Sequence, residues 1–145
     1  RLTFNTIVIF PSNEQLDKWR QCSSNEDINY DYPIKSLENP DKNFFQQCII
    51  KVKAKNIDIA LICLKSWGFN FKKILMPTQP KKGLADVSSE FIIIIGSKGK
   101  LKNIELVIRS NKTIDLIEYA QKTGIEPFLF IGEVITTRNW TYCVG

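Results

Sequence analysis

The segment Phe4-Asn5-Thr6-Ile7-Val8-Ile9-Phe10-Pro11-Ser12-Asn13 opens the chain and decides how the rest of it is interpreted. Ile7, Val8 and Ile9 form a short apolar run, which is typical of a buried β-strand. Pro11 ends that strand because proline has no N–H to donate to a neighbouring strand. In doubly wound α/β folds, ligands bind outside the carboxyl ends of such strands. We therefore expect the turn after this strand to lie at a functional edge of a sheet.

Apolar runs and helical spacings alternate along the rest of the chain. Strands are predicted over residues 44–52, 69–76, 91–95, 104–108, 128–131 and 140–144. Asn56 is a candidate cap for a helix over 57–64 that stops at Gly68, and a second helix over 112–122 is expected to turn Ile114, Ile117 and Tyr119 inward. Residues 13–43 are polar and predict a long loop with at most one helical turn. The alternation predicts an α/β fold with a mainly parallel sheet flanked by helices.

Length and composition predict an ordinary globular domain. The chain of 145 residues is long enough for one domain, residues 1–145, with its own core. It starts at Arg1 just before a strand, so we expect a domain trimmed from a longer chain. No stretch is long and apolar enough for a membrane span. Four cysteines without a CxxC pair and the absence of histidine predict no metal site, and favour reduced thiols in an intracellular protein.

The predicted helix after Asn56 is apolar on nearly every side. Between Ile57 and Leu64 only Asp58 is polar. Such a helix is normally covered on both sides, so a partner chain or missing segments of this chain are expected to cover its outer face. We assign this interface to Ile59, Ile62 and Trp67. The alternative is that Ile59 and Ile62 are merely tolerated at the surface.

Lysines are arranged in alternating sets within a chain of net charge +5. Alternation along a strand places such residues on one face, where they can bind the phosphates of a nucleic acid. The alternative is that they are solvated lysines, which also protect sheet edges from aggregation. The candidate nucleic-acid-binding residues are Lys51, Lys53, Lys55, Lys81, Lys82, Lys98, Lys100 and Lys102.

Several segments resemble the eukaryotic N6-adenine methyltransferase family (the MT-A, seventy-kilodalton-subunit family) in the same order. Leu64-Lys65-Ser66-Trp67-Gly68-Phe69 resembles the family's Leu-Lys-x-Trp-Gly-Phe helix end and is the most specific match. Further similar segments are Tyr32–Glu38, Glu90–Gly99, Phe128–Gly132 and Asn139–Gly145. The resemblance implies a Rossmann-like methyltransferase fold in permuted order, with the catalytic strand first and the S-adenosylmethionine site built largely from C-terminal segments.

The family transfers a methyl group directly from the sulfonium to the adenine amino group. The resemblance implies that an Asp-Pro-Pro-Trp loop supplies acceptors for that amine and an aromatic ring that stacks on the base. Acceptors aimed at developing charge are commonly worth roughly 100- to 1000-fold in rate each. Here the loop positions hold Phe10, Pro11, Ser12 and Asn13, so both the acceptor and the stacking ring are lost.

Two other family motifs are also lost. The positions of its Trp-x-Lys hold Met76 and Thr78. The positions of its Arg-x-His-Asn, which holds the cofactor, have Glu133, Ile135 and Thr136, and only Asn139 keeps a polar group nearby. A glutamate in place of an arginine repels a carboxylate ligand. We therefore expect this chain to have no catalytic residues and to bind no cofactor.

The resemblance then implies a catalytically inactive methyltransferase-like subunit in the nucleus, paired as a heterodimer with an active paralogue that binds S-adenosylmethionine. The expected nucleic acid is DNA rather than RNA, because the composition and degeneration are similar to those of the ciliate DNA adenine methyltransferase complex, with which further DNA-binding subunits associate. Two alternatives stay open: an active S-adenosylmethionine-dependent enzyme with a rearranged site, and a stand-alone nucleic-acid-binding module.

Overall fold

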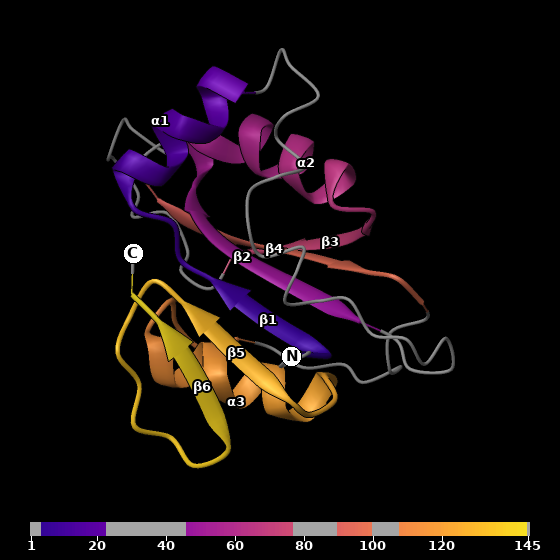
Figure 1. Cartoon of the computed structure of the whole chain (residues 1–145), viewed down its shortest axis with the longest axis vertical. Helices are drawn as coiled ribbons and strands as arrows, with labels where there is room; N and C mark the ends of the chain where they lie inside the picture. Colours follow the sequence, from indigo (N-terminus) through magenta and orange to yellow (C-terminus); the bar gives the residue numbers. More distant parts are fainter. Residues whose placement is uncertain (1–3, 23–45, 77–89, 100–107, 145) are drawn as a thin grey trace.

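A computed structural model describes residues 4–22, 46–76, 90–99 and 108–144 of the chain. These residues form a six-stranded sheet in the order β3-β4-β2-β1-β5-β6, with helices on both of its faces (Figure 1). In chain order the elements are β1 (Thr6–Ile9), α1 (Asn13–Cys22), β2 (Gln47–Lys53), η3 (Ala54–Asn56), α2 (Ile57–Ser66), β3 (Asn70–Leu75), β4 (Phe91–Ser97), α3 (Thr113–Thr123), β5 (Phe128–Ile131) and β6 (Trp140–Cys143).

The sheet is mixed. β1 pairs in parallel with β2 and β5, and β5 pairs in parallel with β6. β4 is antiparallel to both of its neighbours, β2 and β3. β4 is therefore the reversed strand, and the other strands of this sheet run in one direction. The prediction of an α/β fold with flanking helices is confirmed, whereas the sheet combines parallel and antiparallel pairs.

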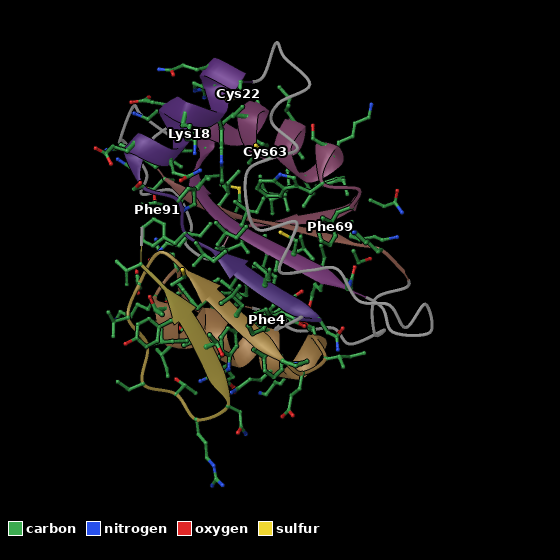
Figure 2. The ribbon with its side chains drawn as sticks, viewed as in Figure 1. Phe4, Lys18, Cys22, Cys63, Phe69 and Phe91 are labelled. Atoms are coloured by element: carbon green, nitrogen blue, oxygen red, sulfur yellow. The ribbon has the colours of Figure 1, made fainter. Side chains whose placement is uncertain are left out.

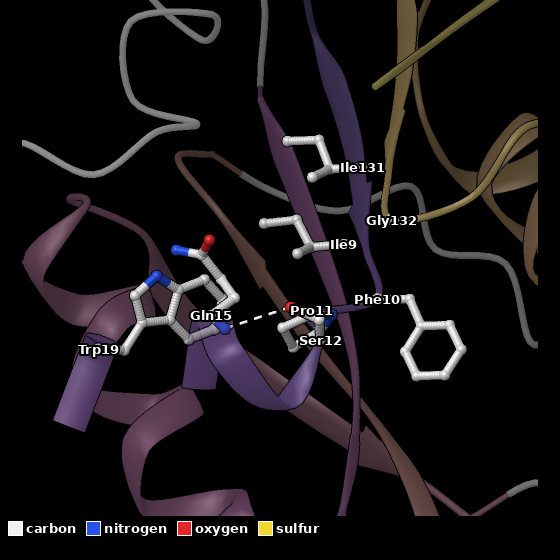
Figure 3. A pocket seen from close by; sticks show the side chains of 8 residues that line it. All are labelled: Ile9, Phe10, Pro11, Ser12, Gln15, Trp19, Ile131 and Gly132. Atoms are coloured by element: carbon white, nitrogen blue, oxygen red, sulfur yellow. Dashed lines mark hydrogen bonds between the residues drawn. The ribbon is translucent and has the colours of Figure 1, made fainter. Parts of the chain in front are cut away.

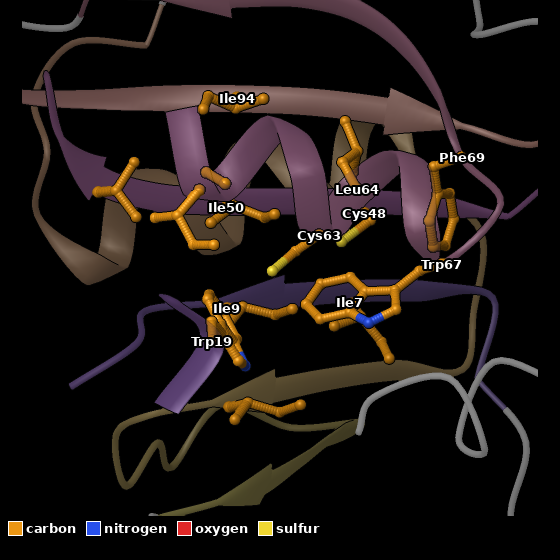
Figure 4. Close-up of a cluster of buried hydrophobic side chains, with 14 of the residues drawn as sticks. Ile7, Ile9, Trp19, Cys48, Ile50, Cys63, Leu64, Trp67, Phe69 and Ile94 are labelled. Carbon is orange, nitrogen blue, oxygen red and sulfur yellow. The ribbon is translucent and has the colours of Figure 1, made fainter. Parts of the chain in front are cut away.

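Two buried clusters fill the space between the sheet and its helices. The α1/α2-side core takes Ile7 and Ile9 from β1 and alternate residues of β2 and β4, and it packs against α1 and α2. Figure 4 shows Trp19, Trp67 and Cys63 packed over these strands, and Figure 2 places Cys63 and Phe69 on the same side. The α3-side core takes Val8 and the other alternate residues, and packs against α3. This alternation is what a strand covered on both faces requires.

Residues 13–22 form the helix α1, so the prediction of a loop is wrong there. Ser12 caps the helix, because its Oγ accepts a hydrogen bond from the backbone N–H of Gln15 at 3.2 Å. Leu16 and Trp19, three positions apart, are the buried residues of this helix. Residues 23–43 of the predicted loop lie outside the described residues.

Three smaller predictions also need correction or cannot be placed. Asn56 makes no side-chain capping bond to α2, and its Oδ1 instead accepts a hydrogen bond from Arg20 at 2.9 Å. Ile114 is 62% exposed rather than inward, whereas Ile117 and Tyr119 are buried as predicted. The strand predicted over 104–108 falls on residues outside the described ranges, apart from residue 108 at its end.

The helix α1 also explains why α2 is apolar on nearly every side. Trp19 of α1 packs edge-on against Trp67, with ring centroids 5.4 Å apart. Arg20 of α1 forms a two-pronged ion pair with Asp58 of α2, with both N···O distances 3.0 Å. One side of α2 therefore faces the sheet and another faces α1. The covering layer that the sequence assigned to a partner is in part supplied by this chain.

Candidate functional site at the carboxyl ends of β1 and β5

The strand order places β1 and β5 at a topological switch point. From β1 the chain passes through α1 to β2 on one side, whereas β5 lies on the other side of β1 and is followed by β6. The connections therefore leave the β1–β5 pair in opposite directions. In open α/β sheets this is where ligands bind, outside the carboxyl ends of the strands. The turn at residues 10–13 follows the carboxyl end of β1 and lies at this switch point.

Backbone contacts lock the ends of the three strands together. The N–H of Phe10 donates to the carbonyl of Ile131 at 2.8 Å, and the N–H of Gly132 donates to the carbonyl of Cys143 at 2.8 Å. Gly132 has φ +124°, and a Cβ on it would lie 2.2 Å from the carbonyl oxygen of Phe10. Only glycine allows both this backbone conformation and this close approach. The geometry of the site thus depends on the absence of a side chain at residue 132.

A small hollow opens between these strand ends and α1 (Figure 3). Its free volume is about 10 Å³, which is roughly the space of one water molecule. The indole Nε1 of Trp19, which borders the hollow, is buried without a hydrogen-bond partner in the described structure. Its lining, which contains no carboxylate, consists of Ile9, Phe10, Pro11, Ser12, Gln15, Trp19, Ile131 and Gly132. We call this space the switch-point hollow.

The ring of Phe10 points away from the switch-point hollow, on the side opposite Gln15 and Trp19 (Figure 3). There it meets Phe91, the first residue of β4, edge to face, with ring centroids 5.7 Å apart and an interplanar angle of 90°. The ammonium group of Lys51 lies beside both rings, with Nζ 4.3 Å from the Phe10 centroid and 4.8 Å from the Phe91 centroid. These distances are within the range of cation–π attraction.

Lys51 is only 6% exposed, although lysines are rarely buried without a partner. Its Nζ donates a hydrogen bond of 2.6 Å to the backbone carbonyl of Asn111, just before α3. Burial lowers the pKa of Lys51 below its ordinary value, and the nearby carboxylate of Glu133 acts in the opposite direction. We refer to Lys51, the rings of Phe10 and Phe91, and the Asn111 carbonyl as the ammonium cluster. Phe91 and Asn111 were not singled out from the sequence, because nothing in their own segments indicates a polar contact.

The four residues that the resemblance assigned to cofactor positions do not converge on one cavity. Glu133 accepts a hydrogen bond of 2.5 Å from Thr113 Oγ1 at the start of α3. Ile135 is buried in the α3-side core, and Thr136 is exposed. Asn139 has φ 70° and precedes β6, so it lies at the amino ends of the strands, where it borders a separate open depression with Gln121 and Glu126. Met76, which the resemblance aligned with the family's Trp-x-Lys motif, is exposed, and Thr78 lies outside the described residues.

The described candidate lysines do not form one track. Lys51 is buried, Lys53 is half-buried with Nζ 5.9 Å from the Phe91 ring centroid, and Lys55 is exposed. Lys98 lies at the other end of β2, where its N–H donates to the carbonyl of Gln46. The seven residues of β2 separate these two ends by roughly 20 Å. Lys81, Lys82, Lys100 and Lys102 lie outside the described residues.

The candidate interface residues divide into two groups. Ile59 and Trp67 are buried within the chain, at 1% and 3% exposure, so both side chains pack inside this chain and not at its surface. Ile62 is 42% exposed and remains available on the outer face of α2. Other exposed apolar side chains near it in sequence are Phe71 and Ile74 of the edge strand β3.

Within the described ranges, no group of three or more possible metal ligands occurs. None of the helices there has the length and apolar character that crossing a bilayer requires. The chain matches no protein-family model, and no curated protein matches it either.

Proposed function

We propose that this chain is a catalytically inactive methyltransferase-like subunit of an N6-adenine methyltransferase complex. It pairs with an active paralogue that carries the intact Asp-Pro-Pro-Trp loop and binds S-adenosylmethionine. Its role is to stabilise that partner and to help bind nucleic acid, DNA in preference to RNA, in the nucleus. The proposal combines the sequence motifs with the geometry of the switch point.

The architecture supports a Rossmann-like methyltransferase fold in permuted order. The first strand of the chain, β1, lies beside β5, which belongs to the C-terminal part. The turn at residues 10–13 and the segment proposed to correspond to the cofactor-binding motif are therefore neighbours, as the permuted order requires. A parallel sheet with one reversed strand near its edge, here β4, is compatible with a doubly wound fold.

The observation that carries the proposal is the orientation of Phe10. In an active enzyme this position supplies a carboxylate that accepts hydrogen bonds from the adenine amine as positive charge develops. Here it supplies a phenyl ring, and the ring is held in the ammonium cluster between Lys51 and Phe91. An acceptor at this place would have to displace a packed internal contact. The loss of the acceptor is therefore accompanied by internal packing of the Phe10 ring, and is more than a change of one surface residue.

The cofactor side of the switch point supports the same proposal. The switch-point hollow has a free volume of about 10 Å³, whereas small-molecule sites commonly have roughly 300–1,000 Å³. Glu133 adds a negative charge where the family's arginine would meet the cofactor's carboxylate, and its own carboxylate is engaged by Thr113. Both features disfavour S-adenosylmethionine at this edge.

The partner surface is centred on Ile62 in this proposal, because Ile59 and Trp67 are internal. The exposed Lys65 follows one turn later on α2, and Lys55 precedes the helix. An apolar side chain flanked by cations fits a partner surface with an apolar centre and acidic rim. Lys55 and Lys98 remain candidate phosphate contacts at separate ends of the sheet.

The test is co-expression with a paralogue that carries an intact Asp-Pro-Pro-Trp loop, followed by purification through a tag on this chain. We expect a stable complex that methylates adenine, and we expect changing the partner's catalytic aspartate to Ala to abolish that activity. Calorimetric titration of this chain alone with S-adenosylmethionine should show no micromolar binding. Micromolar binding would favour an active enzyme with a rearranged site, and salt-dependent DNA binding without a partner would favour a stand-alone module.

A further inference from the structure

Lys51 occupies an environment that resembles a ligand site more than an ordinary lysine contact. Its ammonium group is buried, faces two aromatic rings and donates to a backbone carbonyl. We propose that Phe10, Phe91 and the Asn111 carbonyl form a binding site for a primary alkylammonium ion, and that Lys51 occupies this site from within the chain.

The geometry of the cluster matches the chemistry of such a cation. The Phe10 and Phe91 rings stand at 90° to each other, so the ammonium group contacts two different aromatic surfaces. The carbonyl of Asn111 accepts one N–H at 2.6 Å, and the carboxylate of Glu133 provides a further favourable charge. Aromatic rings, a carbonyl and a nearby anion are the groups that recognise ammonium ligands.

The components come from segments far apart in the sequence. Phe10 follows β1, Lys51 belongs to β2, Phe91 begins β4, and Asn111 precedes α3. Lys53, on the same face of β2, lies further from the Phe91 ring, with Nζ at 5.9 Å. The hydrogen bond of Lys51 to the Asn111 carbonyl therefore links the sheet to the start of α3. It lies at the carboxyl edge of the sheet, close to the turn at residues 10–13.

This inference deepens the proposed function and rests on it for its meaning. In an active relative, a carboxylate at the Phe10 position receives the substrate amine. In this chain a resident amine already lies against that position. Lys51 therefore acts as an internal substitute for the amine and is a second inactivating residue beside Phe10.

The binding site can be tested by removing its internal ligand. Lys51→Ala deletes three methylene groups and the amine, which together correspond to n-propylammonium. We expect n-propylammonium chloride to raise the thermal midpoint of Lys51→Ala by roughly 3 °C or more relative to sodium chloride at equal ionic strength. The matched variant Lys55→Ala, which removes an exposed lysine, and the unaltered chain should show no such rise. n-Propanol, which has the same length without the charge, should rescue less than the amine.

A second measurement keeps the proposal testable if Lys51→Ala does not fold. Phe10→Leu and Phe91→Leu each remove an aromatic face while keeping an apolar side chain. Each should lower the pKa of Lys51, followed by NMR of the labelled lysine amine, whereas Phe69→Leu beside the exposed Lys98 should leave it unchanged. Equal rescue of Lys51→Ala by amine, alcohol and salt, or an unchanged Lys51 pKa in both leucine variants, would overturn the proposal. Neither the thermal midpoint nor the pKa of Lys51 involves the cofactor, adenine or a partner. Failure of the ammonium-site proposal can therefore be distinguished from failure of the proposed function.

Discussion

The Nζ of Lys51 lies 4.3 Å from the centroid of the Phe10 ring, across the neighbouring strands β2 and β1. Ile9 pairs with Ile50 in the register of these strands, and Phe10 and Lys51 are the residues that follow this pair in the sequence. The residue that we propose to stand in place of a catalytic aspartate is thus in direct contact with a buried cation. This contact determines the expected effect of placing an aspartate at position 10.

Phe10→Asp is expected to form an ion pair with Lys51 and to leave the chain without methyl-transfer activity. The new carboxylate would be neutralised by Lys51, and Asn13 still offers no ring to stack on a base. A double-mutant cycle with Lys51→Met measures the pairing through urea unfolding. We expect a coupling of about 1–3 kcal/mol in favour of the Asp–Lys pair. A coupling near zero, or transfer of labelled methyl groups by Phe10→Asp alone, would contradict this prediction.

Stability should depend on pH through Lys51. Burial lowers the pKa of Lys51 in the folded chain, so between the folded and unfolded pKa values the unfolded chain binds more protons. Stability therefore rises with pH through that window, up to the pKa of an unfolded lysine at about 10.4. The free energy of unfolding of the unaltered chain minus that of Lys51→Met should increase from neutral to alkaline pH. The same difference for the exposed Lys55→Met serves as the control, and a flat Lys51 difference would show that burial does not perturb this amine.

Gly132→Ala should destabilise the chain by at least about 2 kcal/mol, because positive φ strain and a collision with the Phe10 carbonyl act together. Gly68→Ala is the matched control. Gly68 also has a positive φ, of +85°, but among the described residues an added Cβ would meet the flexible Lys98 side chain alone, at 3.6 Å or more. Gly68→Ala should therefore lower the free energy of unfolding by about 1 kcal/mol, the contribution of the backbone strain alone. Equal losses in chemical denaturation would mean that the carbonyl contact at residue 132 is unimportant.

Much of the fold could be predicted from apolar runs, and the failures have identifiable causes. The isoleucines of β4 indicated a buried strand, but its reversed direction depends on the connections and leaves no mark in the run itself. α1 was missed because its surroundings are polar, although Ser12 and Gln15 have the spacing of a helix cap and Leu16 and Trp19 lie on one helical face.

The candidate site was predicted in part. The strand β1 and the turn after it followed from the apolar run and from Pro11, whereas the functional role of this edge stays a prediction. The ammonium cluster could not be predicted, because it joins side chains of β1, β2 and β4 to a backbone carbonyl. A signal was nevertheless present: Lys51 interrupts the apolar sequence Cys48-Ile49-Ile50-Lys51-Val52, where a strand covered on both faces has no solvated position.

The two isoleucines assigned to a partner interface should now behave differently. Ile59→Asp places a charge in the α1/α2-side core and should unfold the chain, which circular dichroism would detect. Ile62→Asp changes an exposed position and should leave the thermal midpoint within roughly 2 °C of the original. It should nevertheless abolish co-purification with the partner. Unchanged pairing by a folded Ile62→Asp chain would exclude Ile62 from the interface.

The central claim is that this chain supports methylation without performing it. The most direct measurement is transfer of radiolabelled methyl groups from S-adenosylmethionine to adenine in DNA, by the purified chain alone and by its complex with the paralogue. We predict incorporation by the complex, loss of that incorporation when the partner's catalytic aspartate is changed, and none by the chain alone. Methyl transfer by the isolated chain would contradict the account.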